Sequence, residues 1–435
     1  MKKLVLIIAI ITTALSSQAQ KVWTLDECVD YAMEHNVTIL QSVISQNNAE
    51  FQYKMAKNAW LPTVSAEASE SFGFGQSPSA NGVYVSDNSS STSFGISVGM
   101  PLFNGLNLYN QTKSSSLELS AAKKDLEAMK FDLKLLIMSY YMQVVYNKEL
   151  KAIAEKQLTV TEEQHEKTQQ LFELGKVPES DVYESAAQVA TAKSSLIQAN
   201  NNLMLSILDI VQALELENVD DFDVVSPDNF IDMESAKLPS QETTYEFALQ
   251  HQPKMEAANM RLEKSYFDVK ATKSSWYPSL SLFAGYSNGY YNYFTADYNS
   301  PFSEQIKNNG RTSFGVRLNV PIFNAMQTKY RVEQTKLSIE NQELAINTAK
   351  KELKKDIQQA YYNALAAEQK YRAAEETFQA ADVAYRFSGE SFKAGRATLL
   401  ELNESKNRLF KSESEMLQAK YEYFYRVQVL NFYNQ

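Results

Sequence analysis

Two stretches of the chain alternate apolar and small polar side chains with a strict period of two. These stretches, residues 93–105 and 313–325, lie 220 positions apart and are copies of one motif. A period of two predicts a β-strand whose two faces have different surroundings. The apolar face carries Phe94, Ile96, Val98, Met100 and Leu102 in the first copy, and Phe314, Val316, Leu318, Val320 and Ile322 in the second. This pattern alone leaves open whether the apolar face meets a soluble core or lipid.

The duplication extends through most of the chain. Ala32, His35, Phe51, Lys57, Trp60 and Pro62 recur 216 positions later as Ala248, His251, Phe267, Lys273, Trp276 and Pro278, and Phe172 and Gly175 recur 220 positions later as Phe392 and Gly395. We therefore divide the sequence into a first repeat at 20–216, a linker at 217–241 and a second repeat at 242–435.

Each repeat begins with two helices. Apolar periodicity predicts a short helix at 25–36 or 243–250, followed by a helix of roughly 25 residues that ends at the tryptophan of a Trp-X-Pro motif. Pro62 and Pro278 then end the helix and begin a strand, because proline cannot continue a helix. This strand precedes the motif described above, so each repeat contributes a pair of strands.

The strand after each proline is also amphipathic, with Glu70 and Phe283 as exceptions to its pattern. Loops at 77–91 and 288–309 are expected to join the two strands of each pair. The second loop carries the aromatic residues Tyr290, Tyr291, Tyr293, Phe294 and Tyr298. Aromatic side chains near the ends of membrane strands are typical of the interfacial belt of a membrane barrel. An adhesive or purely structural loop is the alternative.

A very long helix is predicted after each strand pair, at 107–174 and 325–394. At 1.5 Å per residue, about 70 residues span roughly 105 Å, which no compact globular core requires. Steps of three and four residues define a seam of Leu119, Ala122, Leu126, Met129, Leu133, Leu136 and Tyr140 in the first helix, and of Ile357, Ala360, Ala364, Ala367, Tyr371, Ala374, Phe378, Ala381, Tyr385 and Phe392 in the second. Such seams predict coiled-coil packing.

Each long helix is expected to end at a tight turn. Gly175 and Gly395 supply the left-handed residue that commonly ends a helix, and Pro178 suits the start of the next one. A helix of about 35 residues then returns, which gives one antiparallel helical hairpin per repeat.

Composition narrows the functional class. Residues 1–19 have the basic start, apolar run and small-residue end of a signal peptide, so we expect the mature chain to be exported and to begin at Gln20. The net charge of −10 becomes −12 once Lys2 and Lys3 are removed, which disfavours a nucleic-acid partner. No later stretch approaches the ~20 apolar residues of a membrane helix. Cys28, the single cysteine, is expected to be a small core residue.

Nothing in the sequence predicts catalysis. The three histidines, His35, His165 and His251, have no metal-ligand spacing, and no phosphate-binding loop is present. We therefore expect no enzyme activity, no cofactor and no metal, and a structural role for His35 and His251.

The number of strands indicates that chains must combine. Open sheet edges are not tolerated in lipid, and the smallest membrane barrels have ~8 strands. Four strands per chain permit a dimer with eight strands or a trimer with twelve.

The chain resembles the TolC family of outer-membrane channel proteins over essentially its whole mature length. The resemblance rests on the opening Trp23-Thr-Leu-Asp-Glu-Cys-Val-Asp-Tyr-Ala32, both Trp-X-Pro strand entries, both Pro-X-Phe-Asn strand exits and both tip turns. It implies a mainly α protein with membrane β structure: a homotrimer whose 12-stranded barrel in outer-membrane lipid continues into an α-helical barrel in the periplasm. The implied partners are a periplasmic adaptor (membrane fusion) protein and an inner-membrane transporter.

The resemblance also implies roles for residues near the tip turns. Family members close the periplasmic end with acidic residues six and nine positions after the tip glycine. The implied aperture residues are Asp181, Glu184, Glu401, Glu404, Phe392 and Arg396, and the implied adaptor contacts are Gly175, Lys176, Val177, Gly395 and Ala397. Phe392 lacks the phenol hydroxyl found in the family, and Ala397 replaces an arginine. Acids in the first turns of a helix are alternatively explained by the helix dipole.

Small-molecule efflux is the function we predict, and protein secretion through the same kind of duct is the alternative within the family. A secreted coiled-coil adhesin would explain the heptads and tyrosines but not the duplicated amphipathic strands. A periplasmic scaffold or binding protein would leave the apolar strand faces without a partner.

Overall fold

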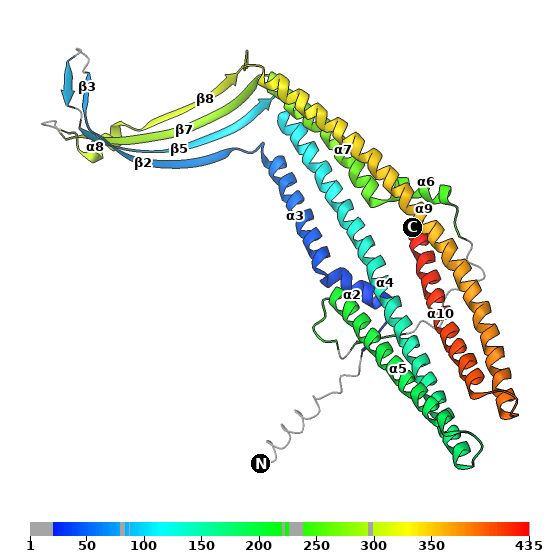
Figure 1. Ribbon diagram of the computed structural model, residues 1–435. Helices are drawn as coiled ribbons and strands as arrows, with labels where there is room; N and C mark the ends of the chain where they lie inside the picture. Colours follow the sequence, from blue (N-terminus) through cyan, green and yellow to red (C-terminus); the bar gives the residue numbers. More distant parts are fainter. Residues whose placement is uncertain are drawn as a thin grey trace, which may run out of the picture. The chain divides into compact units, whose positions relative to one another are not determined.

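The computed structural model describes residues 21–78, 83–86, 88–219, 222–225, 238–294 and 299–434 (Figure 1). The predicted signal peptide and Tyr298 lie outside these residues. The chain forms two compact units. Of the described residues, the helical unit contains 21–44, 124–219, 222–225, 238–256 and 348–434, and the sheet unit contains 45–78, 83–86, 88–123, 257–294 and 299–347. Each unit takes segments from both sequence repeats.

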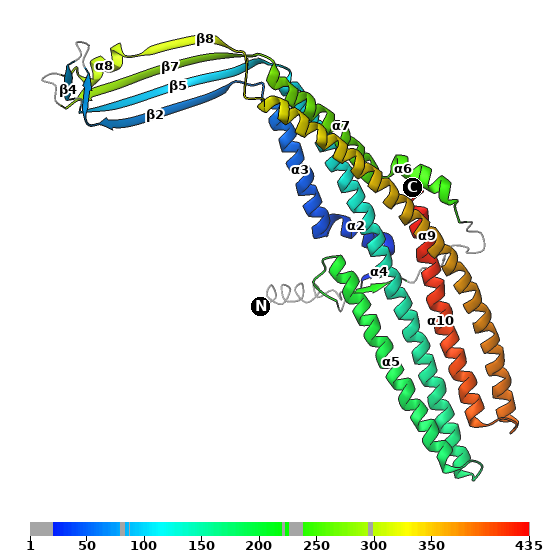
Figure 2. The ribbon, with the colours of Figure 1, turned by 45° about the horizontal axis from the view of Figure 1, so that its top comes forward.

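Four antiparallel strands form the main sheet of the sheet unit. They are β2 (Thr63–Gly73), β5 (Ser89–Asn104), β7 (Ser279–Tyr293) and β8 (Arg311–Asn319). Their spatial order is β2-β5-β7-β8, so the two repeats meet where β5 pairs with β7 (Figure 2). Both strands that were expected to follow a proline begin directly after it, at Thr63 and Ser279, which confirms the prediction.

Strand register places the apolar side chains in rows across the sheet. One row joins Val64, Val98, Ala284 and Phe314, and the next joins Ala66, Ile96, Tyr286 and Thr312. The neighbouring row on the other face joins Ser65, Ser97, Gly285 and Ser313. The period of two therefore produces one apolar and one small polar face, as the sequence predicted.

The strand ends differ from the prediction. Val320 and Ile322 lie beyond β8, which ends at Asn319 because its partner β7 begins at Ser279, the residue opposite. In β5 a register shift between Pro101 and Phe103 brings Phe103, rather than Leu102, opposite Leu280. Proline lacks the N–H that a regular ladder requires, which explains an irregularity at this point.

The two exceptional side chains of the sheet each have a partner. The Glu70 carboxylate accepts a hydrogen bond from the Thr92 hydroxyl on the neighbouring strand. Phe283 lies on the polar face, where a Cβ atom added to Gly315 would be 2.8 Å from its ring. The Arg317 guanidinium lies 5.3 Å from the centre of the same ring, a distance suited to a cation–π contact.

The connection between β7 and β8 is shorter than predicted, whereas the connection between β2 and β5 has the predicted length. Tyr290, Tyr291 and Tyr293 belong to β7 itself rather than to a loop. The remainder of this connection contains the short helix α8 (Phe302–Asn308), and the connection in the first repeat contains the paired strands β3 (Gln76–Pro78) and β4 (Tyr84–Ser86). Tyrosine is common in strands, so a strand through the tyrosine-rich stretch is physically reasonable.

Short helices precede the strands in both repeats, as predicted. They are α2 (Leu25–His35) and α3 (Val37–Asn58) in the first repeat, and α6 (Gln241–His251), α7 (Pro253–Lys273) and the 3-10 turn η1 (Ser274–Trp276) in the second. His35 and His251 stack on the aromatic residue one turn earlier, with ring centres 4.0 Å from Tyr31 and 4.2 Å from Phe247. In each, Nδ1 also lies close to the carbonyl oxygen of that aromatic residue. Both histidines thus have structural contacts at helix ends.

A small parallel sheet was not foreseen. Strand β1 (Lys21–Trp23) pairs with β6 (Phe222–Val224), which lies inside the segment expected to be a linker or an irregular equatorial belt. Trp23 and Phe222 pack together in the main hydrophobic core with Cys28, which is buried as predicted. The Tyr141 hydroxyl donates hydrogen bonds to the carbonyl oxygens of Trp23 and Val225.

Two helical hairpins complete the chain and match the predicted lengths. They are α4 (Asn107–Glu173) with α5 (Glu179–Ala213), and α9 (Gln327–Lys393) with α10 (Leu399–Phe432). The predicted seam of α9 is confirmed at Ile357, Ala364 and Ala367, which are buried. The seam of α4 was wrong in part: Leu136 is 43% exposed, while Ile137 is fully buried. Within the described residues, no helix is both long and apolar enough to cross a bilayer.

Candidate functional site

The tip of the first hairpin is a tight turn built around Gly175. Its φ of 69° lies in the left-handed region that glycine adopts without a steric penalty. The Gly175 N–H donates to the Phe172 carbonyl and the Lys176 N–H to the Leu171 carbonyl, at 2.8 and 2.9 Å. This pair of bonds is the Schellman arrangement, which satisfies the last carbonyl groups of α4.

The tip of the second hairpin has the same backbone. Gly395 has a φ of 70°, and the N–H groups of Gly395 and Arg396 donate to the carbonyl oxygens of Phe392 and Ser391, respectively. Helix α10 then begins with a capping box, in which the Thr398 backbone N–H and hydroxyl both donate to the Glu401 carboxylate at 2.8 and 3.1 Å. Glu401 therefore stabilises the helix end, as the alternative interpretation of the acids proposed.

A groove of about 1140 Å³ within the helical unit is lined by both tips. The first hairpin contributes Leu174, Lys176, Val177 and Asp181, and the second contributes Tyr385, Phe392, Gly395 and Ala397, among others. Six of the eleven residues that the sequence placed at the aperture or the adaptor contact line this groove. Gly175, Glu184, Arg396, Glu401 and Glu404 do not line it and are exposed.

Charges in the groove come from both hairpins. Lys393 forms an ion pair with Glu390, and Arg386 with Asp382, each at 2.8 Å. These pairs are largely exposed, so they contribute little to stability.

Tyr385 is a groove residue whose role the sequence did not suggest. It lies seven residues before Phe392, two helical turns away on the same side of α9, and supplies a phenol hydroxyl that Phe392 lacks. Burial, together with the negative charge of Glu163, raises the pKa of Tyr385. Its hydroxyl therefore stays protonated and can donate a hydrogen bond. The spacing of seven residues between Tyr385 and Phe392 in the predicted seam was the signal that could have identified it.

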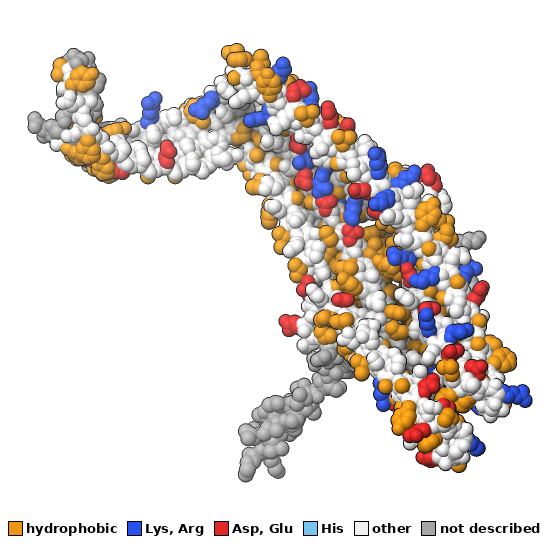
Figure 3. Space-filling view, in the orientation of Figure 1, with side chains coloured by type: hydrophobic (Ala, Val, Ile, Leu, Met, Phe, Trp, Pro, Cys, Tyr) orange, Lys and Arg blue, Asp and Glu red, His pale blue; other side chains and the backbone are white. Residues whose placement is uncertain are grey.

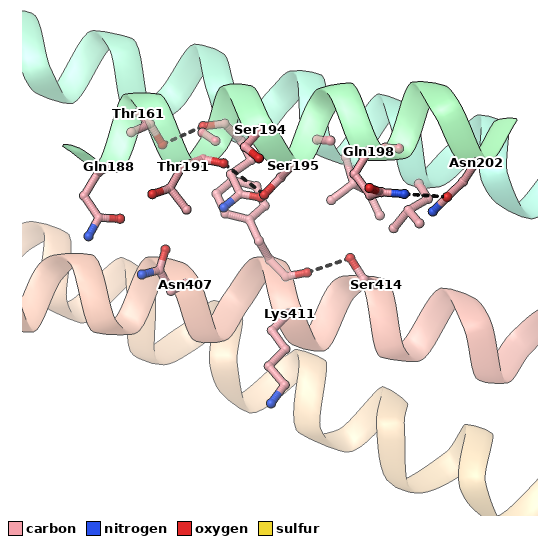
Figure 4. A pocket seen from close by; sticks show the side chains of 17 residues that line it. Thr161, Gln188, Thr191, Ser194, Ser195, Gln198, Asn202, Asn407, Lys411 and Ser414 are labelled. Carbon is pink, nitrogen blue, oxygen red and sulfur yellow. Dashed lines mark hydrogen bonds between the residues drawn. The ribbon is translucent and has the colours of Figure 1, made fainter. Parts of the chain in front are cut away.

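A second groove, of about 600 Å³, runs between α5 and α10 and is closed on one side by α4. Figure 4 shows side chains of both helices facing it, including Thr191 and Gln198 from α5 and Asn407 and Ser414 from α10. Of the described residues that line it, Lys411 alone is charged. This surface can bind a helix through uncharged polar contacts.

A buried lysine lies between α10 and α4, close to the tips. Lys406 is only 2% exposed, and its Nζ donates to the Thr161 hydroxyl at 3.3 Å. Burial lowers the pKa of Lys406. The side-chain amide nitrogens of Gln164 and Asn403, one turn further along the same two helices, are buried and have no hydrogen-bond partner. No pattern in the sequence predicted this polar layer.

Side chains of the apolar rows of the sheet are open to the surroundings in the single chain. Phe314 is 85% exposed, and Val316, Leu318, Val64 and Ile96 are each more than half exposed. Figure 3 shows few charged side chains on the strands and many on the helices. An exposed apolar surface of this extent indicates contact with lipid or with another protein.

The sequence as a whole matches a known family. Residues 28–214 and 244–431 each match the pattern described as outer membrane efflux protein, one match in each repeat. The chain belongs to the outer membrane efflux protein family. The expected resemblance and the outer-membrane location are thereby confirmed, and the family is one of outer-membrane channel proteins.

The chain is similar to known outer-membrane proteins over most of its length and most of theirs. Outer membrane protein TolC of Vibrio cholerae is 23% identical, with 96% of this chain and 92% of the relative covered. Outer membrane efflux protein BepC of Brucella suis is 22% identical, with 94% and 85% covered. Among solved structures, the CmeC outer membrane channel of Campylobacter jejuni superimposes with a TM-score of 0.77 at 16% identity, covering 94% of this chain and 85% of that one. The MtrE channel of Neisseria gonorrhoeae, solved in its open state, gives 0.73 at 19% identity, with 94% and 88% covered. These likenesses establish the fold.

No group of three or more His, Cys, Asp or Glu side chains in the described part of the chain is placed to hold a metal ion. His165, the third histidine, instead has its Nδ1 2.7 Å from the Ser185 hydroxyl, between α4 and α5.

Proposed function

We propose that the protein is the outer-membrane channel of a tripartite export system and forms an exit duct for small molecules across the periplasm. The observation that carries this proposal is an amphipathic four-stranded sheet in the same chain as two helical hairpins that share a groove at their tips. Four strands cannot close a barrel in a bilayer, so chains must combine. Three chains would supply twelve strands, with the rows of Phe94, Ile96, Val98, Phe314 and Val316 facing lipid.

The groove at the tips is the proposed contact for a periplasmic adaptor protein. Lys176, Val177, Gly395 and Ala397 surround its open end, and the adaptor would connect the duct to an inner-membrane transporter that supplies the energy. The mainly uncharged groove between α5 and α10, in which Lys411 is the one charged residue among the described lining residues, extends this surface along the hairpins. A helical adaptor segment would fit there because the lining mixes apolar side chains with uncharged polar ones and contains that single charge.

The proposed periplasmic aperture is formed by Asp181, Glu184, Glu401 and Glu404, with Phe392 and Arg396 beside them. Threefold symmetry would bring each acid into a ring, where like charges concentrate cations. Glu401 also accepts the hydrogen bonds of the capping box, and this contact at the helix end is compatible with a place in the ring.

Deletion of the gene that encodes the protein, followed by complementation with the intact gene, tests this function. Cells that lack it should accumulate fluorescent efflux dyes, and complemented cells should expel them. The purified protein should come from the outer-membrane fraction and run as a trimer in mild detergent. Unchanged dye accumulation with loss of a secreted protein from the medium would favour protein secretion. A monomer that is stable without detergent would exclude both forms of duct.

A further inference from the structure

Two strands of the main sheet have only one neighbour each. The strand order places β2 and β8 at its edges. All eleven residues of β2 are exposed, as are all residues of the nine-residue β8 except Gly315. Both pair with their inner neighbour without a register shift, and neither contains proline. Regular, uncovered edges of this kind are competent to pair with a further strand.

Another stretch of edge in the same sheet is blocked by side chains. Strand β7 continues past Ser287, its last residue paired with β8. There the Asn309 side chain donates to the Gly289 carbonyl at 2.7 Å. The Gln305 side-chain amide accepts from the Tyr291 N–H and donates to the Tyr291 carbonyl. The Asn299 side-chain amide does the same with the N–H and carbonyl of Tyr293. These amides occupy the place of a further strand. The contrast indicates that β2 and β8 are open because each receives a strand.

The two open edges carry opposite charges on the same face. Glu67 of β2 lies in the row of Gly95, Ser287 and Arg311, on the small polar face, and Arg317 of β8 has the same parity as Arg311. No described residue of the chain forms an ion pair with Glu67. We infer that, where β8 of one copy meets β2 of the next in the proposed trimer, Glu67 and Arg317 form an ion pair across the junction on the polar face.

The charges also select how the copies associate. Pairing β2 with β2 would bring Glu67 carboxylates together, and pairing β8 with β8 would bring arginines together. Like charges on adjacent strands are destabilising, whereas opposite charges contribute favourably. Only the head-to-tail pairing of β8 with β2 brings opposite charges together, and repeated head-to-tail contacts can close into a ring.

The lengths of the strands restrict the register. Nine residues of β8 fit on eleven of β2 at offsets of zero, one or two residues, and the middle offset would place apolar side chains on the polar face. The two remaining registers place either Gly315 or Arg317 opposite Glu67. In these registers Phe314 lies opposite Ala68 or Glu70 of the next chain instead of Val64, the β2 residue in its own row.

The geometry of a membrane barrel independently favours the same two registers. A tilt of about 35–45° over four strands spaced about 4.8 Å apart requires a stagger of roughly four to six residues per chain. The shifts from Val64 to Ala68 and from Val64 to Glu70 are the two even values in that range. In the first register Arg317 is a diagonal neighbour of Glu67, and in the second it lies directly opposite; both are within reach of a long side chain.

Arg311 provides a matched control. It lies on the same strand and the same face as Arg317, but in the two registers it faces Ser71 or Gly73, several residues from Glu67. Arg317 also has a fixed position, because its guanidinium lies over the Phe283 ring on the polar face. Its charge should therefore matter for the junction, and that of Arg311 should not.

This inference rests on the proposed trimeric channel, and charge reversal tests it. The measurement is the temperature at which purified trimers dissociate on a heated detergent gel, for E67R, R317E, the double reversal and R311E. Each of E67R and R317E should lower this temperature by roughly 5 °C, and the double reversal should restore most of the loss. R311E should leave it unchanged and should not rescue E67R. In addition, cysteines at Ser65 and Asn319 should crosslink neighbouring chains in the register with Arg317 opposite Glu67, and cysteines at Thr63 and Asn319 in the other.

The outcomes separate the inference from the function. Trimers of E67R and R317E that dissociate like wild type, or a rescue of E67R by R311E equal to that by R317E, would overturn the ion pair while leaving the channel intact. A protein that forms no trimer at all would instead contradict the proposed function.

Discussion

The two tip turns share one backbone and differ in how the next helix begins. Both place glycine in the left-handed region and form the same two hydrogen bonds to the preceding helix. After the first turn, however, α5 begins at Pro178 without a side-chain cap, whereas α10 begins with the Thr398–Glu401 capping box. The duplicated motif thus preserves the backbone requirement, while each copy uses its polar side chains differently.

The difference extends to the acids that follow. Asp181 lines the groove between the hairpins and is partly buried, while Glu401, at the equivalent repeat position, is exposed and bound to the end of its own helix. Equivalent positions in a repeat therefore need not have equivalent roles. Four sets of variants test this comparison.

Replacing either tip glycine should have the largest effect, and the two effects should be equal. G175V and G395V should each lower the free energy of unfolding by roughly 2 kcal/mol, because a β-branched residue is strained at positive φ. Denaturant unfolding followed by circular dichroism measures this. G389A is the control, since Gly389 lies in α9 with open space around it; it should stabilise by about 0.5–1 kcal/mol. Unequal losses at the two tips would show that the shared backbone is not equally important.

The contributions of the return helices α5 and α10 to stability should differ in their dependence on pH. Lys406 is buried in α10, whereas Ala186 at the equivalent position of α5 is exposed. Since burial lowers the pKa of Lys406 in the folded state, the unfolded chain binds more protons between that pKa and about 10.4, and stability should rise with pH across this window.

K406M should therefore stabilise the protein at neutral pH by about 1 kcal/mol and flatten the rise toward alkaline pH. Unfolding curves at several pH values measure both effects, with A186M as the control. A destabilised K406M with an unchanged pH profile would indicate that the hydrogen bond to Thr161 outweighs the cost of burying the charge.

Because of the capping box, stability should depend on the residue before the return helix at the second turn but not at the first. T398A should cost about 1 kcal/mol, while T398S should retain the stability because serine keeps the hydroxyl acceptor. P178A should change stability by less than about 0.5 kcal/mol, since no side-chain cap is lost there. Helix stability in denaturant is the measurement, and equal effects of T398A and P178A would contradict the assigned difference.

The smallest change in stability is expected from acids of the proposed aperture that do not cap a helix. D181N and E404Q should leave unfolding within about 0.5 kcal/mol of wild type but lower cation selectivity in planar-bilayer recordings. E401Q should lower both the free energy of unfolding and the cation selectivity, because it weakens the capping box as well as the proposed ring of charges. Conduction unchanged in all three variants would mean that the acids are helix-end residues and that the aperture lies at other side chains.

Local sequence patterns determined most elements of this protein. The period of two, the Trp-X-Pro breaks and the tip glycines predicted the strands and hairpins, and the observed α4 ends at Glu173, one residue from the expected end. These features depend on interactions within a few residues: proline ends a helix, glycine permits positive φ, and alternation separates two faces. The motifs in their duplicated order were also sufficient to indicate the family.

Contacts between distant residues were decided only by the tertiary structure. Pairing of β1 with β6 joins residues about 200 positions apart, and the end of β8 at Asn319 depends on where β7 begins. The burial of Lys406 and the place of Tyr385 in the groove depend on which helix faces meet. A seam pattern specifies a spacing but not the neighbouring surface, which is why Leu136 was assigned to the interior while Ile137 occupies it. The same limit applies to Glu401, whose position in the sequence is that of Asp181 and whose partner, Thr398, has no counterpart at Pro178.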